Sequence, residues 1–223
     1  MLNLQKISHN YFQGGNTVNV IKNLDLSLKK NCIVGLFGPS GSGKSTLLNL
    51  IGLIEKPSNG NIFIDNCDTV KFKDEMKTKL RREKISFIFQ NNQLLEDFTC
   101  LENIALPLLL NGTTFSNSKQ KALNLLSKFN LHNKSNYKPA LLSGGEQQRI
   151  SVLRALIKQP KIILADEPTG SLDKLNAKIV MENIIDLSRQ LETLTIVATH
   201  NVNFLPLFDL SYEIQNGKLV ELK

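Results

Sequence analysis

The stretch CIVGLFGPSGSGKST, residues 32–46, decides the fold of this 223-residue chain. Its first six residues form an uninterrupted apolar run, which is typical of a β-strand buried on both faces of a sheet. The pattern G-x-x-x-x-G-K-[ST] follows, and then a leucine- and isoleucine-rich segment that we expect to be a helix over residues 45–54. Strand, glycine-rich loop and helix in this order predict a loop that binds the phosphates of a nucleoside triphosphate.

Each residue type in this loop has a chemical role in binding phosphate or Mg²⁺. Gly38, Gly41 and Gly43 allow the backbone to curl so that its N–H groups surround phosphate oxygens. Lys44 is expected to reach the β- and γ-phosphates, and the Ser45 hydroxyl to be a ligand of Mg²⁺. The predicted phosphate-binding residues are Gly38, Pro39, Ser40, Gly41, Ser42, Gly43, Lys44, Ser45 and Thr46.

Two further apolar runs, KIILADEPT at residues 161–169 and TLTIVATH at residues 193–200, predict strands buried on both faces. An amphipathic helix is expected between them, and strand–helix–strand at this spacing predicts a parallel sheet. Asp166 and Glu167 would then stand at the carboxyl end of a strand, where ligands of α/β sheets collect. We expect Asp166 to hold Mg²⁺ and Glu167 to polarise the water that attacks the γ-phosphate.

Three more residues are candidates for the same site. Gln90 closes the expected strand ISFIFQ, residues 85–90, and could bridge the metal and the water. His200 ends its strand and could hydrogen-bond to the γ-phosphate, although a histidine at a strand end is also compatible with a structural role. Tyr11 is expected in a loop after the first strand, where its ring could stack on adenine or simply lie on the surface.

The stretch LSGGEQQR, residues 142–149, predicts a second anion-binding turn. Ser143, Gly144 and Gly145, followed by Glu146, come immediately before an expected helix, whose N-terminal N–H groups attract negative charge. This turn has no carboxylate pair of its own. If two copies met head to tail, the turn of one could cap the γ-phosphate bound by the other. Asp173 would then lie close to the interface between the two copies.

The remaining segments predict two smaller lobes. Alternating or apolar runs at residues 24–28, 62–65 and 85–90 indicate strands. The spacing of Ala122, Leu125, Leu126 and Phe129 predicts a helix with one apolar face. A further helix, lined by Ile150, Leu153 and Ile157, is expected after the LSGGE turn and is stopped by Pro160. Near the C-terminus, Asn-Gly at residues 216–217 between alternating runs predicts a β-hairpin.

The composition indicates which classes of partner and location the chain is expected to have. The formal net charge of +7 comes from lysines spread along the chain, and no arginine-rich tract occurs, so we expect no nucleic-acid partner. No apolar run approaches the roughly 20 residues that span a bilayer, and the N-terminal residues do not form a secretory signal. We therefore expect a cytoplasmic protein unless a partner holds it at a membrane. Cys32, Cys67 and Cys100 are widely spaced and are expected to be reduced and mostly buried.

Taken in order, GPSGSGKST, Gln90, LSGGEQQR, ILADEP, SLD and His200 resemble the motif set of ATP-binding cassette (ABC) nucleotide-binding domains over essentially the whole chain. The resemblance implies an α/β fold: a P-loop NTPase (RecA-like) core with a parallel sheet, an antiparallel β lobe and an α-helical lobe. It implies one domain over residues 1–223, with the helical lobe at roughly residues 91–158. It also implies an ATPase that needs Mg²⁺, a homodimer with two ATP at the interface, and a separate membrane subunit that the hydrolysis drives.

A narrower resemblance rests on LLEDFTCLENIALPLLLNG, residues 94–112, and on ADEPTGSLD. These stretches are similar to the group of cassettes that contains the LolD, MacB and FtsE types. The resemblance implies lipoprotein release from the cytoplasmic side of the bacterial inner membrane, with a MacB-like exporter or an FtsE-like transmitter of force as alternatives. It also implies that Leu94, Leu95, Phe98 and Leu101 help to form a groove for a coupling helix of the membrane subunit, as an alternative to an ordinary helical-lobe core.

Overall fold

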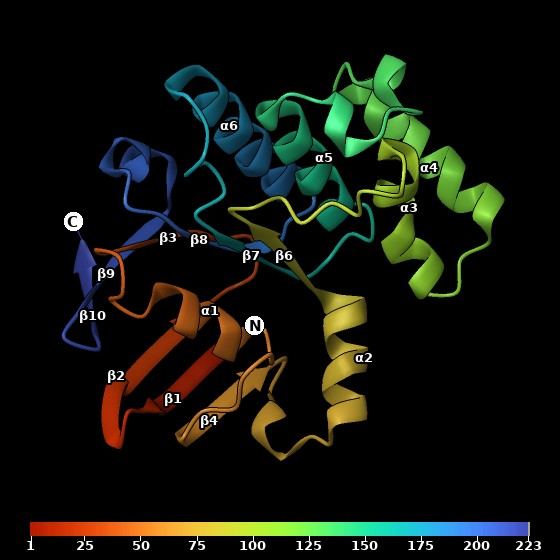
Figure 1. Ribbon diagram of the computed structural model, residues 1–223. Helices are drawn as coiled ribbons and strands as arrows, with labels where there is room; N and C mark the ends of the chain where they lie inside the picture. The colour runs from red at the N-terminus through yellow and green to blue at the C-terminus, as the bar shows by residue number, and fades with distance from the viewer. Residues whose placement is uncertain (223) are drawn as a thin grey trace.

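The computed structural model describes residues 1–222, and Figure 1 shows its helices and strands. In chain order the strands and helices are β1 (Leu2–Gln13), β2 (Asn16–Leu28), β3 (Ile33–Phe37), α1 (Lys44–Ile51), β4 (Asn59–Ile64), β5 (Cys67–Asp68), α2 (Asp74–Lys84), β6 (Ile85–Phe89), α3 (Cys100–Leu110), α4 (Phe115–Lys128), α5 (Gly144–Leu156), β7 (Ile162–Asp166), α6 (Lys174–Gln190), β8 (Leu194–Ala198), β9 (Leu210–Gln215) and β10 (Lys218–Leu222). Short 3₁₀ turns lie at Thr69–Lys71, His132–Lys134, Pro139–Leu141 and Val202–Leu207.

Two sheets organise the chain. One is antiparallel, with strand order β2-β1-β4-β5. The other has the order β10-β9-β3-β8-β7-β6, in which β9, β3, β8, β7 and β6 run parallel and β10 pairs antiparallel with β9. Figure 1 shows α1 between the two sheets, with α5 and α6 on the opposite face of the larger sheet. The mixed α/β fold with a parallel core and an antiparallel lobe agrees with the sequence prediction.

Hydrophobic packing follows these layers. One cluster of buried residues joins the antiparallel sheet, α1 and one face of the parallel sheet, and includes Leu4, Leu47 and Ile196. A second cluster joins the other face to α3, α4, α5 and α6, and includes Ile104, Leu126 and Ile184. Each fully buried Leu or Ile contributes roughly 1.5–3 kcal/mol relative to an exposed one. β3, β7 and β8 are therefore buried on both faces, as their continuous apolar runs predicted.

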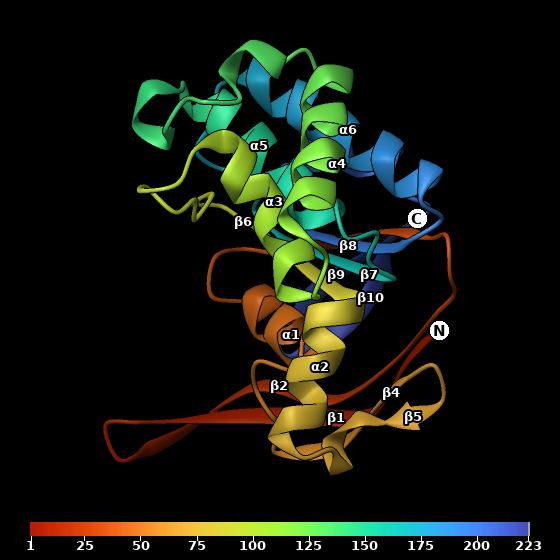
Figure 2. The same ribbon diagram turned by 90° about the vertical axis from the view of Figure 1, so that its right-hand side faces the viewer.

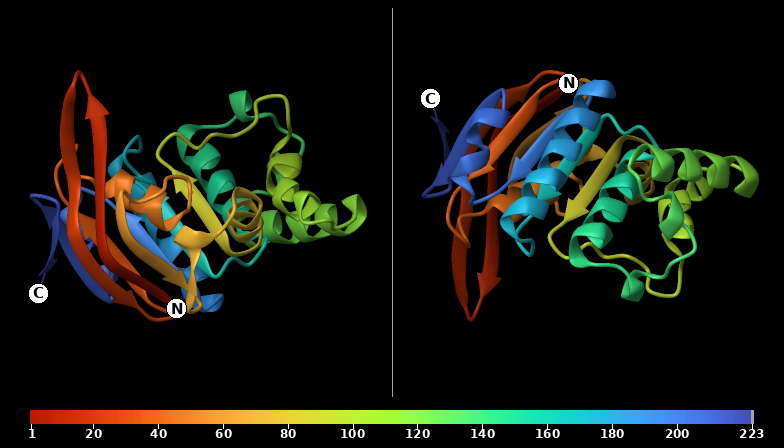
Figure 3. Two further views of the ribbon diagram at one scale, coloured as in Figure 1. Left: turned by 90° about the horizontal axis from the view of Figure 1, so that it is seen from below. Right: turned by 90° about the horizontal axis from the view of Figure 1, so that it is seen from above.

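The helices α3, α4 and α5 stand beside the sheets as a separate group, which Figure 3 shows extending away from the antiparallel sheet. α3 packs against both α4 and α5. Capping boxes fix the N-terminal ends of α3 and α5. Thr99 exchanges hydrogen bonds with Glu102 at the start of α3, and Ser143 does so with Glu146 at the start of α5. On α4, Ala122 and Leu126 are buried, so the predicted apolar face is the packed face.

Local conformation corrects several predicted ends. α1 ends at Ile51 rather than near residue 54, because Gly52 closes the helix and Leu53 has a positive φ of 58°. β7 ends at Asp166, because Glu167 turns into the left-handed region. The predicted hairpin is confirmed, with Asn216 and Gly217 both at positive φ between β9 and β10.

The expectation that Tyr11 lies in a loop was wrong. Tyr11 lies inside β1, paired with Val18 of β2, rather than in a loop after the first strand. Figure 2 shows that the β1–β2 hairpin is long and extends beyond the rest of its sheet. The polar residues near its tip do not end the strand because each is paired with a residue of the facing strand.

The cysteines differ in their exposure to solvent. Cys100 is buried, but Cys67 is exposed on β5, so the expectation of mostly buried thiols holds only in part. Over residues 1–222, none of the helices has the length and apolar character that crossing a bilayer requires.

Candidate functional site

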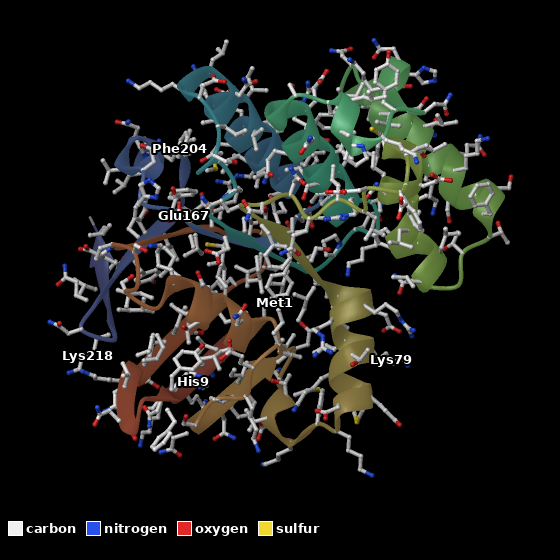
Figure 4. The ribbon with its side chains drawn as sticks, viewed as in Figure 1. Met1, His9, Lys79, Glu167, Phe204 and Lys218 are labelled. Carbon is white, nitrogen blue, oxygen red and sulfur yellow. The ribbon has the colours of Figure 1, made fainter. Side chains whose placement is uncertain are left out.

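A pocket of about 700 Å³ opens where β3, β6, β7 and β8 present their carboxyl ends. Figure 4 shows Glu167 between α1 and α6. The lining residues are Tyr11, Val20, Ser40, Gly41, Gly43, Lys44, Ser45, Thr46, Gln90, Asp166, Glu167 and His200. Segments that are more than 180 residues apart in sequence therefore meet in one cavity.

The glycine-rich loop between β3 and α1 forms one wall of the pocket. Gly41 has a φ of 78°, and a Cβ placed there would meet nothing within 4 Å among the described residues. Gly43 has a φ of 106°, and a Cβ there would lie 2.8 Å from Cγ1 of Val20 on β2. The first glycine thus leaves an open surface on the loop, and the second permits close packing of the loop against the antiparallel sheet.

Lys44 begins α1 and is buried. Its ammonium donates hydrogen bonds to the carbonyl oxygens of Gly38, at 2.7 Å, and Pro39, at 3.1 Å. It also lies 3.6 Å from Oε1 of Glu167. The side chain therefore curls back over the loop and carries positive charge into the pocket beside a carboxylate.

Asp166 is the last residue of β7 and its Oδ1 atom is buried without a hydrogen-bond partner among the described residues. Burial raises the pKa of this carboxyl; the Ser45 hydroxyl opposes the rise, the charge of Glu167 adds to it, and that of Lys44 opposes it. An unpartnered carboxylate oxygen next to a hydroxyl is the kind of oxygen donor set that Mg²⁺ uses together with substrate phosphates. The residues present therefore fit the predicted ion.

Glu167 has a φ of 45°, which is uncommon for a residue with a side chain. Its backbone N–H donates to the carbonyl of Ala198 on β8, at 2.9 Å. One carboxylate oxygen faces Lys44, and the other accepts a hydrogen bond from Nδ1 of His200, at 2.9 Å. Because the backbone turns at Glu167, the adjacent carboxylates of Asp166 and Glu167 point in different directions.

Gln90 follows β6 directly and lines the pocket. A Cβ on Gly170 would lie 2.9 Å from its amide nitrogen, so the chain after Glu167 passes close to this side chain. The strand end is held by Gln148 of α5, whose amide donates to the carbonyl of Phe89 at 2.9 Å. Gln90 is therefore presented from a strand that is tied to the helical group.

Tyr11 also lines the pocket, from the antiparallel sheet. Its hydroxyl donates to Oε2 of Glu55 at 2.7 Å and lies 3.3 Å from Oγ1 of Thr46. Its predicted contact with adenine remains a prediction, now with the ring carried by a strand.

The second predicted anion-binding turn is separate from this pocket. Ser143 caps α5: its Oγ accepts from the N–H of Glu146 at 3.3 Å, and its own N–H donates to that carboxylate at 2.9 Å. Asp173 caps α6 by accepting from the N–H groups of Leu175 and Asn176, both at 3.0 Å. Neither of these caps, nor Gly144 or Gly145, is among the residues that line the pocket.

Comparison with known proteins decides the family. The family described as "ABC transporter" matches residues 21–170, which hold the glycine-rich loop, Gln90, the turn at Ser143 and the two carboxylates. The chain belongs to the ABC transporter family.

Similar proteins align with the cassette over nearly their whole length. The lipoprotein-releasing system ATP-binding protein LolD of Hyphomonas neptunium is 40% identical over 221 residues, covering 99% of this chain and 97% of that protein. LolD of Legionella pneumophila is 38% identical over 98% of this chain and 96% of its own length. The uncharacterized ABC transporter ATP-binding protein YvrO of Bacillus subtilis is 38% identical over 99% and 96%.

Solved structures show the same fold. The dimeric structure of the bacterial ABC transporter cassette MJ0796 superposes with a TM-score of 0.91 at 37% identity, covering 100% of this chain and 98% of that chain. A dimeric post-hydrolysis state of MJ0796 bound to ADP and Pi has the same TM-score at 36% identity.

The predicted docking groove of the cassette needs a correction. Leu94 and Leu101 are each only 8% exposed and belong to the hydrophobic core, so they do not form a surface groove. Leu95 and Phe98 are 43% and 37% exposed. The turn between them is held by the buried amide of Asn103, which donates to the carbonyls of Leu95 and Phe98 and accepts from the N–H of Leu95.

Sequence reasoning missed two contributors to the pocket of the cassette. Val20 of β2 lines it, and Glu55 anchors the hydroxyl of Tyr11. Neither residue belongs to a motif. Val20 reaches the site because the antiparallel sheet folds over α1, whereas Glu55 lies after α1 and contacts the site through Tyr11. No local pattern could have indicated them.

Proposed function

We propose that this chain is the ATP-binding and ATP-hydrolysing subunit of an ABC transporter. The observation that carries the proposal is the single pocket in which a glycine-rich loop and Lys44 meet the unpartnered Oδ1 of Asp166 and the Glu167–His200 pair. Hydrolysis of a nucleoside triphosphate requires a cation at the phosphates, a ligand for Mg²⁺ and a general base for the water, and these residues supply all three. The ATP-binding names of the similar proteins support the same nucleotide.

The residues of the pocket have distinct tasks in this proposal. Lys44 neutralises charge on the β- and γ-phosphates. Glu167 accepts a proton from the attacking water. Oε2 already accepts a hydrogen bond from His200, so we assign this task to Oε1, which lies 3.6 Å from the Lys44 ammonium. His200 and Gln90 orient the γ-phosphate and the water. Ser45, Asp166 and Gln90 would hold Mg²⁺, which, when bound, spreads the charge that develops on the phosphate oxygens.

The turn at Ser143 completes a second copy's site. Because the turn and Asp173 lie outside the pocket of their own chain, a head-to-tail dimer is the arrangement in which they contact nucleotide. Its backbone N–H groups and the dipole of α5 would face the γ-phosphate bound by the partner. The dimeric structures of the similar cassette MJ0796 support this arrangement.

We infer that the whole chain, residues 1–223, acts as one cassette with a helical lobe at roughly residues 91–158. It would dock on a membrane subunit through the edge that exposes Leu95 and Phe98. It would work peripherally at the cytoplasmic face of the bacterial inner membrane. The LolD names of several similar proteins support release of lipoproteins toward the outer membrane as the transport reaction.

Light scattering on Glu167→Gln tests the ATPase proposal. This variant retains the nucleotide-binding groups but slows hydrolysis, so adding ATP and Mg²⁺ should shift the protein from monomer to dimer. ADP serves as the matched control and should leave a monomer, because the γ-phosphate is absent. A monomer that binds ATP but never dimerises would contradict the shared site.

Depletion of the protein in its host tests the transport reaction. Loss of lipoprotein release should leave outer-membrane lipoproteins in the inner-membrane fraction, which membrane fractionation measures. Cells that filament while their lipoproteins reach the correct membrane would instead favour the transmitter of force.

A further inference from the structure

The hydroxyl of Tyr11 is held by Glu55, a residue that belongs to none of the sequence motifs. It donates to Oε2 of Glu55 at 2.7 Å, so its remaining lone pairs face Oγ1 of Thr46 at 3.3 Å. Glu55 follows the end of α1, the helix that begins with Lys44. One tyrosine of the antiparallel sheet is therefore tied to both ends of the helix that carries the phosphate loop.

Glu55 is itself held on three sides. Its second oxygen, Oε1, accepts a hydrogen bond from the amide of Asn49 at 2.8 Å. Nε2 of His9 lies 3.1 Å from Oε2, and the His9 side chain is only 10% exposed. The rings of His9 and Tyr11 meet edge to face, with centroids 4.8 Å apart and an interplanar angle of 85°. Figure 4 shows His9 in the antiparallel sheet, with α1 between it and Glu167.

The electrostatics agree with a charged acceptor. Burial raises the pKa of Glu55, but hydrogen bonds from Tyr11 and Asn49 and the neighbouring His9 outweigh it, so the net pKa is lowered. Burial also raises the pKa of Tyr11, which keeps its hydroxyl protonated and able to donate. A hydrogen bond to an ionised carboxylate is roughly twice as strong as a neutral one. The Tyr11–Glu55 contact is thus well suited to hold the ring in one orientation.

We propose that Glu55 is a positioning residue that presets the ring of Tyr11 as the contact surface for the nucleotide base. The inference rests on the proposed ATP-binding function and adds a residue that sets its base recognition. A ring already held in its bound orientation loses less conformational freedom when the base arrives, so affinity rises without a new contact. Glu55 is not among the residues that line the pocket, so it acts on the base through Tyr11.

Comparing two ligands separates this role from a structural one. Inorganic triphosphate contains the groups that the phosphate loop binds but lacks the base. Calorimetry would measure the dissociation constants of ATP and of triphosphate, each with Mg²⁺, for wild type, Glu55→Ala, Glu55→Gln and Tyr11→Phe. Glu192→Ala, an exposed glutamate paired with Lys30, is the matched control.

Glu55→Ala should weaken ATP binding by about 3- to 10-fold, the range expected from freeing one side chain, and triphosphate binding by less than about twofold. Glu55→Gln keeps an acceptor for the Tyr11 hydroxyl and should recover most of the ATP affinity. In hydrolysis assays the KM for ATP should rise more than kcat falls. The double variant Tyr11→Phe with Glu55→Ala should bind ATP about as well as Glu55→Ala alone, because both changes remove the same bond.

Equal weakening of ATP and triphosphate by Glu55→Ala would overturn the inference and leave Glu55 a structural residue. Unchanged ATP affinity in both Glu55→Ala and Tyr11→Phe would overturn it as well. Should Glu55→Ala not fold, Glu55→Gln and Tyr11→Phe still test the bond. Wild type that binds ATP no more tightly than triphosphate would exclude the base contact while leaving the ATPase proposal intact, whereas wild type that binds neither ligand would remove both.

Discussion

At the scale of a single residue, the backbone conformation of Glu167 decides where its carboxylate points. Its φ of 45° turns the chain immediately after β7, so that its side chain leaves the direction taken by Asp166. A left-handed conformation of this kind costs of order 1 kcal/mol and persists only where the surroundings impose it. Here the hydrogen bond from its N–H to Ala198 and the contacts of its carboxylate with Lys44 and His200 do so.

Replacing Glu167 by Gln should therefore slow ATP hydrolysis by roughly 10²- to 10⁴-fold, the usual contribution of a general base, while ATP still binds. Steady-state phosphate release and equilibrium nucleotide binding measure the two effects. Glu192→Gln, at an exposed position away from the pocket, should hydrolyse ATP at the wild-type rate. Near-normal turnover of Glu167→Gln would contradict the role of Glu167.

At the scale of elements, the end of α1 decides how closely the helix approaches β6. Gly52 closes α1, and a Cβ at this position would lie 1.9 Å from Cζ of Phe87 on β6. The backbone there has an ordinary φ of −75°, so the glycine is required by space and not by conformation. The phosphate-loop helix thus packs on the strand that presents Gln90.

Gly52→Ala should consequently lower the free energy of unfolding by about 1–3 kcal/mol, the usual cost of overpacking a core. Urea unfolding measures the change. Gly144→Ala is a suitable control, because a Cβ there would meet only Leu172 at 3.9 Å. Combining Gly52→Ala with Phe87→Leu should recover part of the loss, and a double variant as unstable as the sum of the two single variants would exclude this contact as the cause.

On the scale of the whole molecule, the chain carries two half-sites on different parts of the fold. The pocket belongs to the two sheets and α1, whereas Ser143 begins α5 in the helical group. In the proposed dimer each nucleotide is enclosed by the pocket of one copy and the turn of the other. ATP binding then closes the dimer, and hydrolysis allows it to open.

Ser143→Arg should abolish the ATP-dependent dimer and spare ATP binding by the monomer, because a bulky cation would stand where the partner's phosphate must approach. Gel filtration with ATP, in a Glu167→Gln background, measures the dimer. The change also removes a helix cap worth about 1 kcal/mol. Thr99→Ala removes the corresponding cap and capping box of α3, so it controls for lost stability and should still dimerise.

Local patterns determined much of this protein. Residues 32–46 were sufficient to predict the strand, phosphate loop and helix, because a buried strand and a glycine-rich turn are encoded by adjacent residues. The positions of Asp166, Glu167 and Gln90 at strand ends followed in the same way, although the exact ends depended on the turn at Glu167 and on the closure of α1 at Gly52. The hairpin at residues 216–217 was likewise local.

Only the tertiary structure decided what those segments contact. It placed Tyr11 within β1 and tied it to Glu55, and it buried Leu94 and Leu101 in the core while Leu95 and Phe98 remained exposed. It also separated Ser143 from the pocket of its own chain. These outcomes depend on which surfaces of distant segments pack together, and packing between segments far apart in the chain has no period or spacing in the sequence by which it could be recognised.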